Sequence, residues 1–233
     1  MDKVSNTRKC ISYVLKAIVV LSAVIGTFLS AYAGRNSFMG GIRVFMYFTI
    51  QSNILIAIIC AIDCYLLARK KSVDEWWYVF KFVGTVSITL TGVVFGFVLA
   101  PTLGVNAWNL PNTLTHLVVP VAAVIDFFVT AAGVRIRKRN VFFVIIPPLL
   151  YAVYAGIGYV SGWQFAEGIN YPYFFLNWGS PAGAFGFTNE LPFMGSAWWI
   201  LVLIVFLIIV GCCYLFVVDV ISRRQPKNQD GAK

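Results

Sequence analysis

Six long apolar stretches dominate this sequence and constrain its fold more than any other feature. They cover residues 11–33, 43–68, 78–100, 113–133, 141–161 and 196–218. Each is long enough for an α-helix to cross the hydrocarbon core of a bilayer, which takes roughly 20 residues. Of the 233 residues, 60% are hydrophobic and 12% are charged, whereas soluble domains carry about 25% charged residues. We therefore expect a single transmembrane domain over residues 1–233, an all-α bundle of six transmembrane helices.

The basic residues predict how this bundle is oriented. Most of the 18 Lys and Arg residues lie in the N-terminus, the second and fourth links and the C-terminal tail. The other links hold only Arg35, with Arg43 at a span edge, while Lys16 and Lys81 lie within spans. Because cytoplasmic loops are enriched in Lys and Arg, both termini are expected to be cytoplasmic. The short loops and tails favour a bacterial inner membrane.

The first stretch has a second interpretation. Residues 1–33 resemble a signal peptide, with a basic start, an apolar run and a small-residue site at Ala31-Tyr32-Ala33. The apolar run is longer than a usual signal core, which favours an uncleaved first span. Cleavage would leave five spans without inverting the others.

The net charge of +9 would suggest a nucleic-acid partner in a soluble protein. Here the basic residues act as topology signals, and the sequence has no Gly-rich phosphate loop. We therefore expect no nucleic-acid partner. Cys60 and Cys64 are one helical turn apart but have no neighbouring His, so no metal and no organic cofactor is expected.

Polar residues inside a membrane are costly, and each is a candidate functional residue. The densest group lies near the external end of the second span and comprises Thr49, Gln51, Ser52 and Asn53. Three of them, Thr49, Ser52 and Asn53, share one helix face. They could equally form hydrogen bonds to neighbouring helices or to their own backbone.

The only histidine of the chain, His116, lies near the external end of the fourth span. A rise of about 1.5 Å per residue places Thr49 and His116 at similar depths, so they could meet across a helix interface. A hydroxyl beside an imidazole is the minimum for an activated nucleophile. Asp126 lies ten residues beyond His116, too far along the helix to orient the imidazole, and is assigned a structural or network role.

The long link before the last span, from Gly162 to Gly195, is rich in aromatic residues and contains Glu167 and Glu190. Aromatic side chains of this density suit a membrane interface. The link could be an interfacial belt, or a lid that folds back over the site and admits an acyl chain from the bilayer.

Three of these motifs resemble the androgen-induced-gene family of integral-membrane proteins. Phe48-Thr49-Ile50 resembles the segment around the family's catalytic threonine. His116, followed by Pro120 and Asp126, resembles the segment around its catalytic histidine. The stretch Tyr171-Pro172-Tyr173-Phe174-Phe175-Leu176-Asn177 resembles a Tyr-Pro-Phe-Leu-like stretch before the last span. Gln51-Ser52-Asn53 is more polar than the vertebrate pattern.

Some vertebrate members of that family hydrolyse esters between a fatty acid and a hydroxy fatty acid. The resemblance therefore implies a membrane-embedded lipid-ester hydrolase, with a fatty-acid ester drawn from the bilayer as substrate. Thr49 would be the nucleophile and His116 the general base. Ser52, Asn53 or backbone N–H groups would hold the oxyanion.

The remaining site predictions concern residues around this pair. Substrate-binding positions are expected at Gln51, Ser52, Asn53, Tyr171 and Asn177, and structural positions at Pro120 and Asp126. The alternative function is a non-enzymatic lipid-binding or sensory membrane protein, in which the same residues form a pocket. A transporter ranks third, because no pair of broken spans occupies corresponding halves of the chain.

Overall fold

The computed structural model describes residues 6–35, 41–71, 73–131 and 136–223. Six helical segments in this part are long and apolar enough to cross a membrane: Asn6–Gly34, Phe48–Ala68, Glu75–Asn106, Leu110–Thr130, Lys138–Val160 and Ser196–Arg223. The described residues contain no β-strand beyond two isolated bridges in the long link. The predicted all-α architecture with six spanning helices is confirmed.

Three spans are single α-helices and three are interrupted. The single helices are α1 (Asn6–Gly34), α2 (Phe48–Ala68) and α8 (Ser196–Arg223). The third span consists of α3 (Glu75–Val94), the π-helical η2 (Phe95–Leu99), α4 (Ala100–Leu103) and η3 (Gly104–Asn106). The fourth consists of α5 (Leu110–Thr113), the π-helical η4 (Leu114–Val118) and α6 (Val119–Thr130). The fifth consists of η5 (Lys138–Ile145) and α7 (Ile146–Val160).

The second span starts later than the sequence predicted. Residues Gly41–Met46 form a separate 3-10 helix, η1, and Tyr47 has an extended backbone (φ −90°, ψ 139°) that separates it from α2. Thr49 therefore lies in the first turn of α2, not one turn or more inside it. In the fourth span, α6 ends at Thr130. The end predicted for that span, residue 133, lies outside the described residues.

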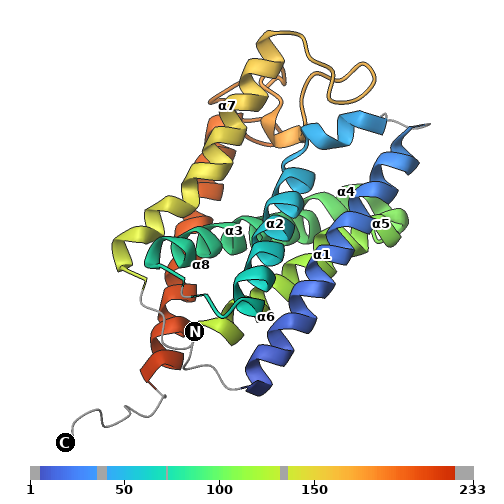
Figure 1. Ribbon diagram of the computed structural model, residues 1–233. Coiled ribbons are helices and arrows are strands. Elements are labelled where there is room, and N and C mark those ends of the chain that lie inside the picture. The colour runs from blue at the N-terminus through green and yellow to red at the C-terminus, as the bar shows by residue number, and fades with distance from the viewer. Residues whose placement is uncertain (1–5, 36–40, 72, 132–135, 224–233) are drawn as a thin grey trace, which may run out of the picture.

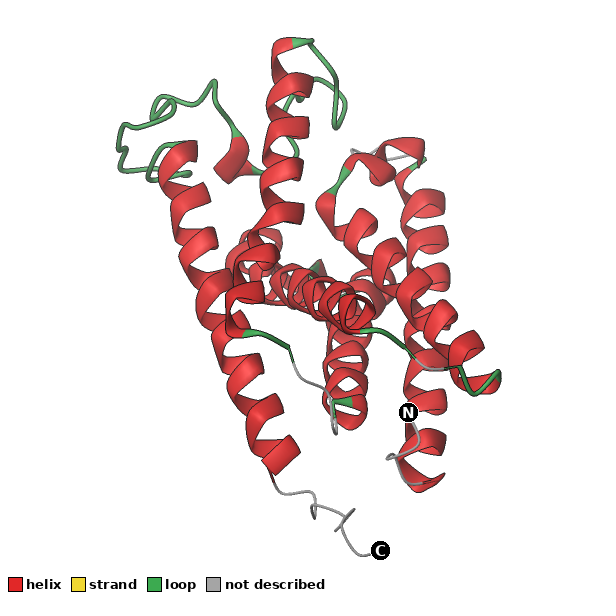
Figure 2. Ribbon diagram, turned by 60° about the vertical axis from the view of Figure 1, so that its left-hand side comes forward, coloured by secondary structure: helices red, strands yellow, loops and turns green. Residues whose placement is uncertain are grey.

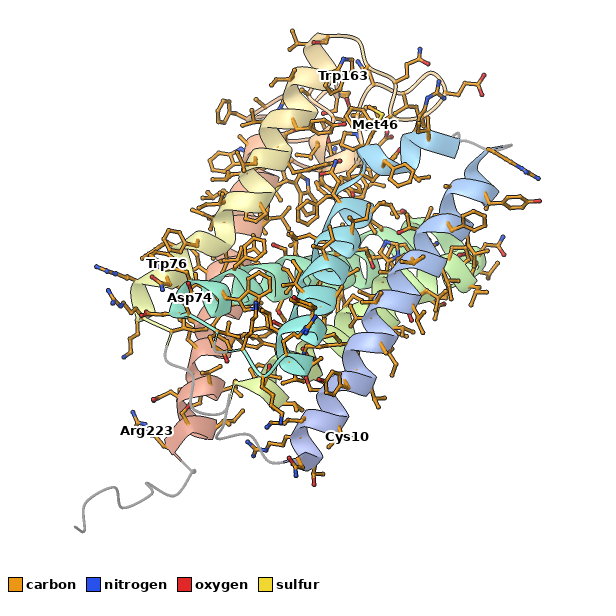
Figure 3. All side chains as sticks on the ribbon, in the orientation of Figure 1. Cys10, Met46, Asp74, Trp76, Trp163 and Arg223 are labelled. Carbon is orange, nitrogen blue, oxygen red and sulfur yellow. The ribbon has the colours of Figure 1, made fainter. Side chains whose placement is uncertain are left out.

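The α3 helix crosses the middle of the bundle, obliquely to its neighbours (Figure 1). It packs against α2, α6, η5 and α8. Figure 2 shows the long link between α7 and α8 as an irregular cap at one end of the bundle. Met46 and Trp163 lie at this end, whereas Cys10 and Arg223 lie at the opposite end (Figure 3). The first residues of α1 and the last residues of α8 thus lie on the same side of the bundle.

Four charged side chains meet inside the bundle, one each from α1, α2, α3 and α6: Lys16, Asp63, Lys81 and Asp126. The Lys81 Nζ atom lies 2.6 Å from Asp63 and 2.7 Å from Asp126. The Lys16 Nζ atom lies 2.6 Å from Asp126 and 3.6 Å from Asp63. Asp126 is fully buried, and both lysines are 2% exposed. Because the two positive and two negative charges balance, the group can be accommodated away from water.

Hydrogen bonds with neutral side chains complete this four-charge network. Ser12 Oγ donates to Asp126 at 2.6 Å, Trp77 Nε1 donates to Asp63 at 2.5 Å, and Lys81 donates to Thr130 at 3.1 Å. The structure places Asp126, for which the sequence suggested a network role, at the centre of this network.

We expect Asp126→Asn to destabilise the bundle, because the amide leaves two buried ammonium groups with one carboxylate. The cost of breaking a buried ion pair is about 3–5 kcal/mol. The matched control is Asp219→Asn, since Asp219 pairs with Arg223 at 2.7 Å on the surface, where such pairs contribute about 1 kcal/mol or less. Thermal unfolding of the purified proteins in detergent measures both, and equal unfolding midpoints for the two variants would contradict a stabilising network.

Candidate functional site

A cavity of about 540 Å³ lies at the capped end of the bundle. Its size is within the range of small-molecule sites, roughly 300–1,000 Å³. Thr49 of α2 and His116 of η4 both line it, together with Tyr171 and Tyr173 of the long link. The two predicted catalytic residues, 67 positions apart in the sequence, are therefore brought to one cavity.

Thr49 is held by a tyrosine that returns from the long link. The Thr49 N–H group donates to the Tyr173 hydroxyl at 3.3 Å, and the Thr49 Oγ1 atom is also 3.3 Å from that hydroxyl. The N-cap residue Tyr47 makes no capping bond to α2, and the Thr49 N–H group has the Tyr173 hydroxyl as its partner instead. Burial raises the pKa of the Tyr173 hydroxyl, although its bonds to Thr49 oppose this. The hydroxyl therefore stays protonated and can donate.

His116 is oriented by its own helix. The Nδ1 atom lies 3.0 Å from the backbone oxygen of Asn112 and 3.0 Å from the Thr115 hydroxyl. A carbonyl oxygen only accepts hydrogen bonds, so Nδ1 carries the proton in the neutral ring and Nε2 is the basic nitrogen. The ring stacks on Phe95, with centroids 3.7 Å apart. The structure thus provides a fixed imidazole whose free nitrogen can take up a proton.

The two stacked rings, of His116 and Phe95, each lie in a π-helical segment that is followed by a proline. His116 belongs to η4, and Pro120 lacks the N–H group that would bond to the His116 carbonyl in an α-helix. Phe95 belongs to η2, and Pro101 follows that segment. Single π-helical turns often occur at functional sites. These two turns were not predicted from the sequence, although Pro101 and Pro120 are a visible signal for them.

Two glycines let neighbouring helices approach the His116 segment. A Cβ atom on Gly92 of α3 would lie 3.0 Å from the His116 oxygen and 3.1 Å from Pro120 Cβ. A Cβ atom on Gly26 of α1 would lie 2.7 Å from the Thr115 side chain. Pro120, predicted to be structural, accordingly packs at the contact between α3 and the fourth span.

Ser52 and Asn53 form the wall behind Thr49. Asn53 Nδ2 donates to the carbonyl of Thr49 at 2.8 Å and to that of Thr115 at 3.1 Å. Ser52 Oγ donates to the Thr49 carbonyl at 2.9 Å and lies 2.7 Å from Thr91 Oγ1. Both side chains are buried and neither lines the cavity. They therefore fasten the two segments that carry Thr49 and His116, in place of the substrate contacts expected from the sequence.

Of the three other residues predicted to bind substrate, one lines the cavity and two do not. Tyr171 lines the cavity. Gln51 is exposed and donates to the backbone of Phe45 at 3.2 Å, and Asn177 accepts from the N–H group of Gly179 at 3.1 Å. Neither amide lines the cavity, so the structure places both outside the site.

Within the described part of the chain, no acidic side chain bonds to His116, and no hydrogen bond joins Thr49 to His116. Glu167 and Glu190 of the long link are exposed, and Asp126 belongs to the four-charge network. The role of orienting the imidazole falls to the Asn112 carbonyl. Among the described residues, no group of three or more His, Cys, Asp or Glu could hold a metal ion.

The long link serves as both a cap and an exposed surface. Residues Tyr171–Phe174 line the cavity, and Phe165 and Phe175 are buried against Tyr47 and Tyr173. Later in the link, exposed apolar side chains gather at Phe185, Phe187, Leu191 and Phe193. One part of the link thus covers the cavity, and another exposes apolar side chains.

A second, smaller cavity of about 60 Å³ also has Thr49 in its lining. It lies between α3, α7 and α8. Its lining is mainly aliphatic and aromatic and includes Leu90, Val94, Leu149, Ala152, Leu203 and Leu207. Thr49 therefore has open space on two sides.

Comparisons of the chain with protein-family models, with characterised proteins and with solved structures gave no match. Function is therefore argued from the residues and their geometry. One cavity collects a hydroxyl, an imidazole with a free nitrogen and a tyrosine donor, which are the groups that acyl transfer requires.

We expect Asn53→Ala to destabilise the protein, because it removes the amide that bonds to the Thr115 carbonyl, while the Thr49 carbonyl keeps the Ser52 hydroxyl as a donor. Unsatisfied buried groups cost about 1–3 kcal/mol each. Gln51→Ala, two residues away, is the matched control, since this exposed amide should change stability by about 0.5 kcal/mol or less. The thermal unfolding midpoints of the two variants are compared in detergent. If the midpoint falls no further for Asn53→Ala than for Gln51→Ala, Asn53 does not hold together the segments that carry Thr49 and His116.

Proposed function

We propose that this protein is a membrane-embedded hydrolase of fatty-acid esters, with Thr49 as nucleophile and His116 as general base. The observation that carries the proposal is that Thr49 and His116, from different spans, line one cavity. The resemblance of their segments to the androgen-induced-gene family supports the same assignment.

In the first step, Thr49 Oγ1 attacks the ester carbonyl carbon while His116 Nε2 accepts the hydroxyl proton. The tetrahedral intermediate then expels the alcohol, whose oxygen takes the proton from His116, and the acyl group remains on Thr49. Water attacks the acyl-threonine in the second half of the reaction, and His116 again accepts and returns the proton. The products are one fatty acid and one alcohol.

The oxyanion is stabilised by donors beside Thr49. The Thr49 N–H group lies at the positive end of the α2 dipole, and the protonated Tyr173 hydroxyl is 3.3 Å from both the Thr49 nitrogen and Oγ1. Ser52 and Asn53 donate to backbone carbonyls instead. The N–H group and Tyr173 therefore replace them as the proposed oxyanion donors.

The proposed site lies at the external side of the membrane. With both termini on the cytoplasmic side, as the Lys and Arg distribution favours, the cavity opens at the external end of the bundle. The substrate would then enter from the outer leaflet, in a bacterial inner membrane.

One observation favours the alternative of a lipid-binding or sensory protein. The partner of the Thr49 hydroxyl is Tyr173 rather than His116, so the nucleophile and base are not yet engaged. Catalytic hydrogen bonds often form only once substrate is bound, which keeps the hydrolase as the first choice. Turnover separates the two functions, because a binder holds lipid without releasing free acid.

Thr49→Ala and His116→Ala should each lower the rate of fatty-acid release by about 10³-fold or more. Thr49→Ser should retain activity because it keeps the hydroxyl. Fatty acid released from a panel of lipid esters by purified, folded protein is the measurement. Thr188→Ala, in the outer part of the link, is the control. Undiminished hydrolysis by both alanine variants would contradict the mechanism.

Tyr173→Phe should lower kcat by about 10²-fold with a small change in KM, as expected for loss of one oxyanion donor. Tyr159→Phe, a tyrosine whose ring packs on Trp178 at the edge of the link, is the control. Steady-state kinetics of one hydrolysed ester distinguish the two, and a Tyr173→Phe enzyme with unchanged kcat would remove Tyr173 from the reaction.

A further inference from the structure

The outer part of the long link, residues 183–195, exposes large apolar side chains although its backbone is held by hydrogen bonds. Phe185 and Phe187 are 70% and 73% exposed, and Leu191 and Phe193 are about half exposed. Exposed apolar patches mark surfaces that contact a protein partner or a membrane. This segment, the outer loop, therefore needs a partner that covers its apolar side chains.

Backbone hydrogen bonds join the outer loop to the start of α8. Three N–H groups at this junction donate to carbonyls at the beginning of the loop: Gly195 to Gly186 at 2.8 Å, Ser196 to Gly183 at 3.1 Å and Ala197 to Ala184 at 3.0 Å. Farther out, the Thr188 N–H group donates to the Phe193 carbonyl at 2.8 Å. The loop and the first turn of α8 are thus one unit, and the loop has a fixed position beside the helix.

Trp198, in the first turn of α8, anchors the exposed rings of the outer loop. Its Nε1 atom donates to the Phe185 carbonyl at 2.8 Å. The Phe187 ring stacks on the indole with centroids 6.1 Å apart, and the Phe185 ring meets it edge-on at 6.4 Å. The two phenylalanines therefore share one surface with Trp198, which is itself partly exposed.

This surface continues into the outward face of α8. Beyond Trp198, that face consists of apolar side chains that are about half exposed: Leu201, Val202, Val205 and Ile209. Because α8 is long and apolar enough to cross a membrane, this face is suited to contact with lipid. Figure 2 shows the outer loop beside the first turns of α8, projecting away from the bundle. The loop therefore lies where a lipid-facing surface meets the membrane interface, the depth at which Trp is enriched.

Two further observations favour lipid as the partner of the outer loop. The residues of the link that line the larger cavity lie between Ile169 and Phe174, so the outer loop has no part in its described lining. Within residues 183–195, Glu190 is the only charged residue. Because the loop has no Lys or Arg to attract phosphate groups, its contact with a bilayer must come from its apolar side chains.

We propose that the outer loop is a membrane anchor, whose Phe185, Phe187, Leu191 and Phe193 side chains insert into the bilayer around the capped end of the bundle. The partner is lipid of the same membrane that α8 crosses, at the boundary between headgroups and acyl chains. Burial of the apolar rings there fixes the height of the cap relative to the membrane surface. This inference needs only that α8 spans a membrane, and it is independent of the hydrolase function.

The test places the photoreactive residue p-benzoylphenylalanine at position 187 of the full-length protein in phosphatidylcholine vesicles. Irradiation should attach phosphatidylcholine at this position, and mass spectrometry of the peptides locates and quantifies the adduct. We expect a yield similar to that at Val205, on the outward face of α8, and about fivefold or more above that at Glu167, an exposed residue earlier in the link. A yield at position 187 no higher than at position 167 overturns the proposal. An adduct with a second copy of the chain in place of lipid also overturns it, since the loop would then be a contact between copies.

A charge placed in the outer loop tests insertion directly, with the photoreactive residue now at position 193. Phe187→Asp should lower the yield of lipid adduct by about fivefold, because a carboxylate resists transfer out of water. Asn189→Asp is the matched control, since it adds the same charge at an already polar, exposed side chain of the loop and should leave the yield unchanged. Thermal unfolding in detergent confirms that both variants are folded. Equal yields from the two variants overturn the insertion of Phe187.

Discussion

A charged side chain inside a membrane protein must find an opposite charge, and this requirement organises the bundle. Lys16, Asp63, Lys81 and Asp126 satisfy it together, and each comes from a different helix. The network therefore fixes how α1, α2, α3 and α6 lie relative to one another. The same four helices, or the segments continuous with them, carry the site at the other end of the bundle. Charge pairing in one half thus helps to position Thr49 and His116 in the other.

The site end of the bundle is shaped by proline and glycine rather than by charge. Pro101 and Pro120 follow the π-helical turns that carry Phe95 and His116, and Gly92 lets α3 approach the second of these turns. The result is an imidazole stacked on a phenyl ring and bonded at Nδ1 to its own backbone. Such a ring keeps one orientation without a carboxylate partner, and its free Nε2 is available to a substrate in the cavity.

The spans were predictable because length and hydropathy decide which segments cross a membrane. Contacts between spans were not, because apolar helices give little indication of their neighbours. Depth along the helices predicted that Thr49 and His116 could meet across a helix interface; in the structure both line one cavity, and each has another hydrogen-bond partner. Nothing in the sequence showed that Tyr173 rather than Tyr171 would contact Thr49, or that Asn53 would bond backbone carbonyls of two spans. These are tertiary contacts between segments far apart in the chain, which spacing along one helix cannot reveal.

The proposed hydrolase function requires that Thr49 becomes acylated during turnover. The most direct measurement is rapid acid quenching of the protein with an activated palmitate ester, followed by peptide mapping with mass spectrometry. We expect a palmitoyl group on Thr49 that forms before steady-state release of fatty acid and is missing from Thr49→Ala. Hydrolysis without an acyl group on Thr49, or with the acyl group on another residue, would contradict it.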